Sequence, residues 1–444
     1  MHWFAKILNT ARAVVLLGSV AGLFAAAWIG SGAALAQGPF ETPPVFKASR
    51  ILPPSLLRGP NHRVNEDVIN DGYINRYTIN SKFGTFTGVS SAKLRKRIRE
   101  INALVAMEQI RGTKVFSDSV KEAGEDVLQG IKMFATAPVD TVKGAVSGVG
   151  KVFTRLGENL FGSKRSETED PRWKSIIGFS KTKREYAYDF NVDVYSTNKI
   201  LQEELDDTAW AGYSGGLTVA AFMSAIPGGA GIATSVTGGS RLMNEVYATT
   251  APADLRKMNR EKLIKMDVNE DIAELFIDNA VFSPRQQTDL VFALEDLKGV
   301  DNRDVFVKFA INTTDPDVAF FRQRMAQMYA AYHKTVAPVG RFVSLGRDVP
   351  VKGLGLAQTV DGVLIFHAPL DYLVWTKLIA RIFGAIDKAA NSIQGVKGKE
   401  LWLAGGLSRL AQKNIEAAGW KVAPNKEVEL LGKIEGANER ISYR

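Results

Sequence analysis

Apolar residues recur at helical spacing along much of the first half of the chain. One such stretch begins after Ser90 and Ser91, either of which can cap the first turn of a helix. Its apolar positions repeat at 4-3-4 spacing: Leu94, Ile98, Ile101 and Val105. A second stripe, over residues 139–160, keeps alternating 3-4 spacing without a break. Both patterns predict amphipathic helices.

Alternation typical of strands is found near each end of the chain. Residues 73–79 alternate aromatic or β-branched with polar positions, and residues 83–89 can pair with them as a short hairpin. Near the other end, residues 356–360 and 363–367 flank Asp361-Gly362, a pair that tolerates the positive φ angles of a two-residue turn. The sequence therefore predicts one hairpin at each end.

The second hairpin opens a region in which strand and helix patterns alternate. A helical pattern follows to about residue 390, then an apolar strand at 401–403. Ser408 can cap a helix that Gly419 ends, and Trp420-Lys421-Val422 suits a last strand. We expect a mainly α fold with a small C-terminal α/β unit of ββαβαβ type and a short N-terminal β-hairpin.

Proline content, charge and periodicity suggest how the chain divides. We expect a signal peptide at 1–36, a proline-rich arm at 37–62, the hairpin plus amphipathic helices at 63–162, a helical domain at 163–337, the α/β domain at 338–424 and a tail at 425–444. The helix starts in the helical domain are explicit. Ser283-Pro284 with Gln286 forms a capping box, and Asp315 precedes Pro316 in the same way.

The first 36 residues have the pattern of a secretory signal. Lys6 and Arg12 precede a charge-free run that begins at Ala13 and ends in Ala34-Leu35-Ala36, so we expect cleavage before Gln37. The run is also long enough for an uncleaved membrane anchor, which is the alternative. Either way, the expected location is the bacterial periplasm or the exterior, with possible membrane association. The absence of cysteine suits such an oxidising compartment.

The centre of the chain lacks charge. Residues 208–240 include no charged residue and no histidine, and Pro227-Gly228-Gly229 divides them into two apolar arms. Two interpretations stay open: a hairpin buried in the helical domain, or a segment that inserts into or rests on a membrane. In the first case, a charge placed at Val219 or Ala225 should unfold the protein.

The amino-acid composition limits the kinds of catalytic and metal-binding site that the protein can have. A chain of 444 residues with 45% hydrophobic and 23% charged residues folds, and its lack of cysteine excludes disulfides, thiolate metal sites and cysteine nucleophiles. After export only His62, His333 and His367 remain, without metal-ligand spacing. No phosphate-binding loop or dinucleotide fingerprint occurs. We therefore predict no metal and no cofactor.

One motif suggests catalysis. Gly212-Tyr213-Ser214-Gly215-Gly216 matches G-x-S-x-G, in which a serine nucleophile sits on a sharp strand-to-helix turn. His367 and Asp361 are candidate partners of Ser214. The acidic lead-in at 202–207 is helical in pattern, whereas the motif needs a buried strand there. A secreted or periplasmic serine hydrolase, esterase- or lipase-like, is thus the alternative function. Near His367, Asp371 is expected to cap the helix that follows it.

The remaining candidate site is basic. Five cations lie within seven residues on the first predicted helix: Lys93, Arg95, Lys96, Arg97 and Arg99. They could be a solvated helix face or could bind an anionic membrane surface. Nucleic acid is disfavoured, because the protein is exported and no aromatic residue interleaves the cations. The primary expectation is an exported, non-enzymatic cell-envelope protein that associates with a membrane or envelope partners through amphipathic helices and the apolar hairpin. Neutralising three of the cations should then weaken lipid binding and leave folding almost unchanged.

Overall fold

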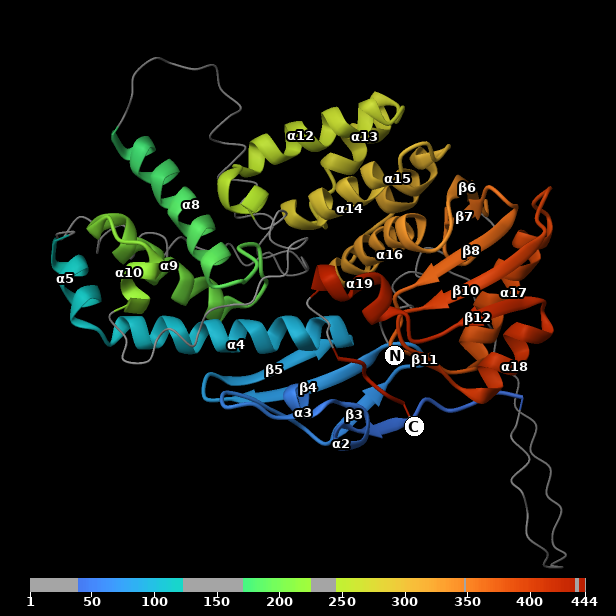
Figure 1. Ribbon diagram of the computed structural model, residues 1–444, viewed down its shortest axis with the longest axis horizontal. Helices are drawn as coiled ribbons and strands as arrows, with labels where there is room; N and C mark the ends of the chain where they lie inside the picture. Colours follow the sequence, from blue (N-terminus) through green and yellow to red (C-terminus); the bar gives the residue numbers. More distant parts are fainter. Residues whose placement is uncertain (1–38, 123–170, 225–244, 347–348, 436–438, 444) are drawn as a thin grey trace, which may run out of the picture.

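The computed structural model describes residues 39–122, 171–224, 245–346, 349–435 and 439–443 (Figure 1). It is about 53% helical with 17% strand, which makes the fold mixed α/β and not mainly α. Several of the strands that the sequence did not indicate have only two or three residues, which is too short to show a period of two. The signal-like segment at 1–36 and the apolar stripe at 139–160 lie outside the described residues.

The N-terminal sheet contains the predicted hairpin as two of its five strands. The strands are β1 (Val45–Lys47), β2 (Arg63–Val64), β3 (Asp67–Asn70), β4 (Asn75–Ser81) and β5 (Gly84–Val89). The order β1-β3-β4-β2 has β5 paired antiparallel to β4, which confirms the hairpin. Helix α4 (Ser91–Arg111) lies along one face and buries Leu94, Ile98 and Ile101 against Tyr77 and Ile79. The range expected to be an extended arm holds β1 and two short helices, α2 (Ala48–Ile51) and α3 (Pro54–Leu57).

A second core forms around the C-terminal half of α4. Its other helices are α5 (Lys114–Glu122), α8 (Pro171–Asp189), α9 (Lys199–Gly215) and α10 (Val219–Ser224). The described part of the uncharged stretch, residues 208–224, lies in this core: Phe222 is fully buried and Trp210 stacks on Phe179 with ring centroids 4.0 Å apart. At Gly212 a Cβ would lie 1.6 Å from the hydroxyl of Tyr186, so glycine is required by close packing. The packing of residues 208–224 agrees with the interpretation of the uncharged stretch as buried. The rest of the stretch lies outside the described residues.

A third core joins five helices to the C-terminal sheet. The helices are α12 (Pro252–Lys265), α13 (Glu270–Ile277), α14 (Pro284–Asp296), α15 (Arg303–Ile311) and α16 (Pro316–Thr335). The predicted capping box of Ser283 and Gln286 opens α14, and Asp315 caps α16. Within the described ranges, no helix is both long and apolar enough to cross a membrane.

The C-terminal sheet has the order β12-β10-β8-β7-β6. In chain order, the helices and strands of this region, inside and outside the sheet, are β6 (Val339–Ser344), β7 (Gly355–Thr359), β8 (Val363–Ala368), β9 (Tyr372–Leu373), α17 (Lys377–Asn391), β10 (Gly398–Leu403), β11 (Gly406–Leu407), α18 (Arg409–Ala417), β12 (Trp420–Ala423) and α19 (Glu427–Glu435). Strands β8, β10 and β12 are parallel, while β7 pairs antiparallel to β8 across the predicted Asp-Gly turn. Helix α16 covers one face, where the hydroxyl of Tyr329 donates to Ile365 O.

Helices α17 and α18 cover the opposite face of this sheet. The Lys399 ammonium donates to Asp387 of α17 and to the carbonyl of Ala418 at the end of α18. Right-handed crossovers from β8 to β10 and from β10 to β12 place both helices on one side, as Figure 1 shows. The two helices are therefore neighbours and run in the same direction.

The last described residues return to the N-terminal sheet. Ile441 belongs to the first core, and Ser442 N donates to Ile51 O at 3.0 Å. The ring of Tyr443 lies 5.2 Å from that of Phe46, and its hydroxyl accepts from Asn75 Nδ2 at 2.9 Å. The two ends of the described chain are thus packed against each other.

Candidate functional site

The amino end of α4 is held by a residue from the other end of the chain. Asp371 is buried and accepts hydrogen bonds from Asn75 N at 2.8 Å and Ser91 N at 3.0 Å. Burial raises the pKa of Asp371 to about 6, and the backbone donors oppose that shift. Asp371 was expected to cap the helix that follows it. It instead binds the start of α4, and Thr376 caps α17. A carboxylate at the amino end of a helix is also attracted by the positive end of the helix dipole, which stabilises the helix.

The five predicted cations lie on α4 just beyond this cap, and none of them is exposed. Lys93 forms an ion pair with Asp317 of α16, and Arg95 pairs with Glu427 of α19 at 2.9 Å. Lys96 pairs with Asp193 at 2.7 Å, and Arg97 pairs with Glu100 at 2.5 Å, while Arg99 is half-buried. The basic run thus faces other parts of the same protein. Its binding of lipid stays a prediction.

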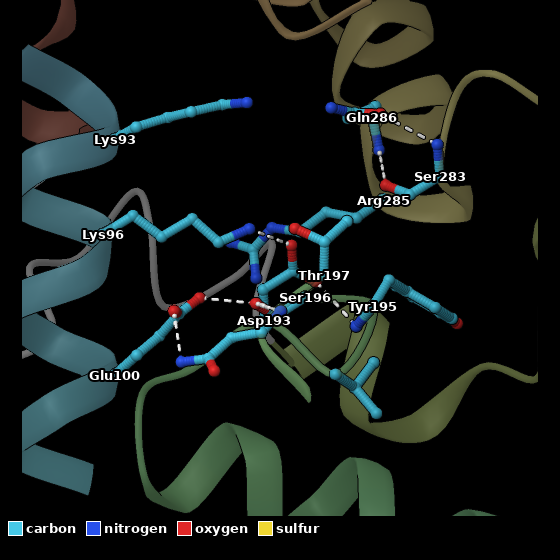
Figure 2. Close-up of polar contacts among 12 residues, drawn as sticks. Lys93, Lys96, Glu100, Asp193, Tyr195, Ser196, Thr197, Ser283, Arg285 and Gln286 are labelled. Carbon is cyan, nitrogen blue, oxygen red and sulfur yellow. Dashed lines mark hydrogen bonds and ion pairs between the residues drawn. The ribbon is translucent and has the colours of Figure 1, made fainter. Parts of the chain in front are cut away.

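The densest polar cluster lies between α4, the 190–198 segment and α14 (Figure 2). Lys96 and Arg285 approach Asp193 from opposite sides, and Asp193 also accepts from Tyr195 N at 2.9 Å. One turn further along α4, Glu100 accepts from Ser196 Oγ at 2.6 Å and Asn198 Nδ2 at 3.1 Å. We call Lys96, Glu100, Asp193, Ser196, Arg285 and Asp289 the polar joint.

Asp289 extends the polar joint to α16. Its carboxylate accepts from the hydroxyl of Tyr247 at 2.5 Å and from Gln323 Nε2 at 2.9 Å, and Arg285 Nε lies 3.7 Å away. The guanidinium of Arg285 also stacks 4.8 Å from the centre of the Tyr247 ring. Polar contacts thus join α4 to the 190–198 segment and α14 to α16, and the charges of Asp193 and Arg285 interact between these two groups.

Charge compensation sets the electrostatics of the polar joint. Burial raises the pKa of Asp193, but the charges of Lys96 and Arg285 outweigh it and the net shift is downward. Burial lowers the pKa of Arg285, but Asp193 and Asp289 outweigh that and raise it overall. Burial raises the pKa of Asp289, opposed by Arg285 and Tyr247. Perturbed pKa values mark functional sites and structural ion-pair networks alike. Here the charges are paired with one another across three segments, which is the pattern of an electrostatic connection.

Removing the carboxylate at the centre of the polar joint should weaken the fold. We expect Asp193→Asn to lower the free energy of unfolding by about 2 kcal/mol at pH 7, because Lys96 loses its ion-pair partner and Arg285 loses a nearby negative charge. Since folding lowers the pKa of Asp193, its contribution is present above about pH 4 and is lost as the pH falls through the folded-state pKa. Urea unfolding at pH 7 and pH 3 measures both effects. Asp278→Asn, at an exposed pair with Arg256, is the control, and an equal effect of the two variants would contradict the prediction.

The three residues of the hydrolase hypothesis occupy different places. Ser214 lies in the last turn of α9, so the segment that leads into the motif is a helix, and its Oγ has no hydrogen-bond partner among the described residues. His367 is fully buried in β8 of the C-terminal sheet, beside the rings of Tyr329, Tyr332 and Trp402. Burial lowers the pKa of His367 to about 3. Asp361 is exposed in the turn at the opposite end of β8. The arrangement differs from the strand-turn-helix geometry that the motif requires.

Comparison with known proteins adds no assignment: no family model, curated protein or solved structure matches this chain. Within the described ranges, no group of His, Asp and Glu side chains could hold a metal ion. The residues that sequence reasoning missed are Asp193, Arg285, Asp289 and Glu427. Each is a single charge in an ordinary polar context, and no local pattern marks it. The only signal in the sequence that could have indicated these acids was the excess of cations on α4. If other parts of the fold cover that helix, they must supply acids to pair with its cations.

Proposed function

We propose that the protein is an exported, non-enzymatic protein of the bacterial cell envelope that acts by associating with the membrane or with envelope partners. The N-terminal segment supports export, through its basic start, charge-free run and Ala34-Leu35-Ala36 ending. The observation that carries the non-enzymatic part is the use of α4. Its apolar residues enter two cores, and its cations pair with acids from α16, α19 and the 190–198 segment.

This use of α4 favours a connected scaffold over a reaction centre. A catalytic group needs a position from which it can reach a substrate, whereas the titratable groups of the polar joint contact one another. A body fixed by paired charges between its parts presents its outer surface in one arrangement, which suits binding. Association would therefore use surfaces other than the basic run of α4.

Cell fractionation tests the proposal. The protein should appear in the envelope or periplasmic fraction, with Gln37 as its first residue. A high-salt wash should release it if the attachment is electrostatic, and carbonate should release it if it is peripheral. Recovery from the cytoplasm with Met1 intact would contradict export. The hydrolase alternative has its own test: a fluorophosphonate probe that labels wild type, but not Ser214→Ala, would replace the non-enzymatic proposal.

A further inference from the structure

Helices α17 and α18 present a second group of cations, and these point away from the protein. Lys377, Arg381 and Lys388 are exposed on α17, and Arg409 and Lys413 are exposed on α18. Among the described residues, none of the five has an ion-pair or hydrogen-bond partner through its side chain. We call these five residues the cationic face. Figure 1 shows both helices on the outer side of the C-terminal sheet, at the end of the molecule far from α5 and α10.

The arrangement of the cationic face follows from the two crossovers. Lys377 and Arg409 are the first residues of two helices that run in the same direction, and Arg381 and Lys413 follow each of them by one turn. Lys388 continues the row on α17, roughly 16 Å from Lys377 at 1.5 Å per residue. Two neighbouring helices on one side of a sheet thus carry these five positive charges.

The acids near these helices are already engaged. Glu41 accepts from Trp375 N at 2.9 Å and from Ser408 Oγ at 2.5 Å, where α17 and α18 begin. Asp387 accepts from Lys399 and from Trp420 Nε1, and Glu416 accepts from Gln412. No acid of the described chain forms an ion pair with the cationic face, and its five positive charges outnumber the carboxylates on the same two helices.

Helix α12 shows that exposed helices of this protein can also hold their cations in ion pairs. On α12, Arg256 pairs with Asp278 at 2.6 Å, Arg260 pairs with Glu274, and Lys262 pairs with Glu295 at 2.7 Å. These three cations are paired with acids of neighbouring helices, whereas none of the five cations of the cationic face is.

Three features of the cationic face fit a bilayer better than a protein or nucleic acid. Within the described chain, no large hydrophobic side chain is exposed on α17 or α18, so the aromatic anchors of protein interfaces are absent there. For the same reason no ring is available for a base to stack on. A group of exposed charges without apolar anchors suits a fluid surface that needs no matching shape. We propose that the cationic face binds the anionic headgroups of a phospholipid membrane, an inference that rests on the proposed envelope location.

Vesicle binding tests this inference directly. The processed protein, which begins at Gln37, should co-sediment with phosphatidylcholine vesicles that contain phosphatidylglycerol, and should not bind phosphatidylcholine alone. Neutralising α17 with Lys377→Gln, Arg381→Gln and Lys388→Gln should weaken binding on the order of 100-fold at low salt, since each cation near an anionic surface contributes on the order of a factor of five. The effect should shrink at high salt.

A matched control removes the same charge elsewhere. Lys257 and Lys265 are exposed on α12, and Lys298 is exposed just after α14. Changing all three to Gln should reduce vesicle binding less than about threefold, by the screened long-range field alone. Equal losses in the two triple variants would overturn the role of the cationic face. Folding is monitored by thermal unfolding. If the α17 variant is unfolded, the wild-type protein decides instead. Bound vesicles should protect Lys377, Lys388 and Lys413 from chemical acetylation more than they protect Lys257 and Lys265.

The outcomes also separate this inference from the proposed function. Wild type that binds heparin but not anionic vesicles would overturn the lipid partner and point to a polyanionic polymer. Wild type that fractionates with the envelope yet fails to bind these vesicles would overturn the inference and leave the envelope proposal standing. Protein recovered from the cytoplasm would contradict the proposed function, whatever the vesicles show.

Discussion

Replacing Glu427 by alanine is expected to lower the free energy of unfolding by about 3–5 kcal/mol. Its carboxylate lies between two buried guanidinium groups, with Arg95 at 2.9 Å from one oxygen and Arg324 at 2.9 Å from the other. The exposed fractions of the two arginine side chains are 6% and 2%, so water cannot replace the lost acid. Two positive charges would then remain buried without the acid that they share.

Urea unfolding at pH 7 measures this effect. Glu429→Ala is the control, because Glu429 lies two residues further along α19 and pairs with Lys426 near the surface. The control should change stability by less than about 0.5 kcal/mol. A Glu427→Ala variant as stable as the control would show that the triad is hydrated in solution.

Val219→Asp is expected to unfold the second core or to lower the free energy of unfolding by several kcal/mol. Val219 is 5% exposed and belongs to the core formed by α4, α5, α8, α9 and α10. A carboxylate placed there loses its hydration and gains no cation, and the cost is comparable with the stability of a whole domain.

The neighbouring residue supplies the comparison. Ala220 is exposed on the same helix, so Ala220→Asp adds the same charge and costs more helix propensity than Val219→Asp, but buries nothing. Thermal unfolding without detergent should show a large loss for the first variant and almost none for the second. Similar melting temperatures would mean that Val219 is not core, and would favour the membrane interpretation of this stretch.

Local signals in the sequence predicted local structure well. The Asp361-Gly362 turn joins β7 to β8 with Gly362 at a φ of 89°, and the Ser283 capping box opens α14. In each case the cause and the effect lie within four residues. The N-terminal hairpin was found for the same reason, whereas β1 and β2 were missed because proline-rich and two- or three-residue segments have no periodicity.

The basic run of α4 could not be interpreted in this way. Lys96 and Asp193 are 97 residues apart, and Lys93 and Asp317 are 224 apart, so no window of sequence contains both partners. An exposed helix face and one covered by distant acids have the same local pattern. Neutralising these cations is now expected to destabilise the protein, contrary to the expectation of unchanged folding, because Arg95 and Lys96 are held in half-buried or buried pairs. A loss of vesicle binding in such variants would therefore not identify a lipid site.

The packing of Ile441 and Tyr443 on the N-terminal sheet affects when the protein can fold. Phe46 and Asn75 leave the ribosome early, but their partner Tyr443 is the last residue described and follows after on the order of tens of seconds of synthesis. Glu427 and Asp371 likewise reach α4 only late in synthesis. Contacts so far apart in sequence form slowly. The first core therefore cannot be completed until residues 441–443 have been synthesised.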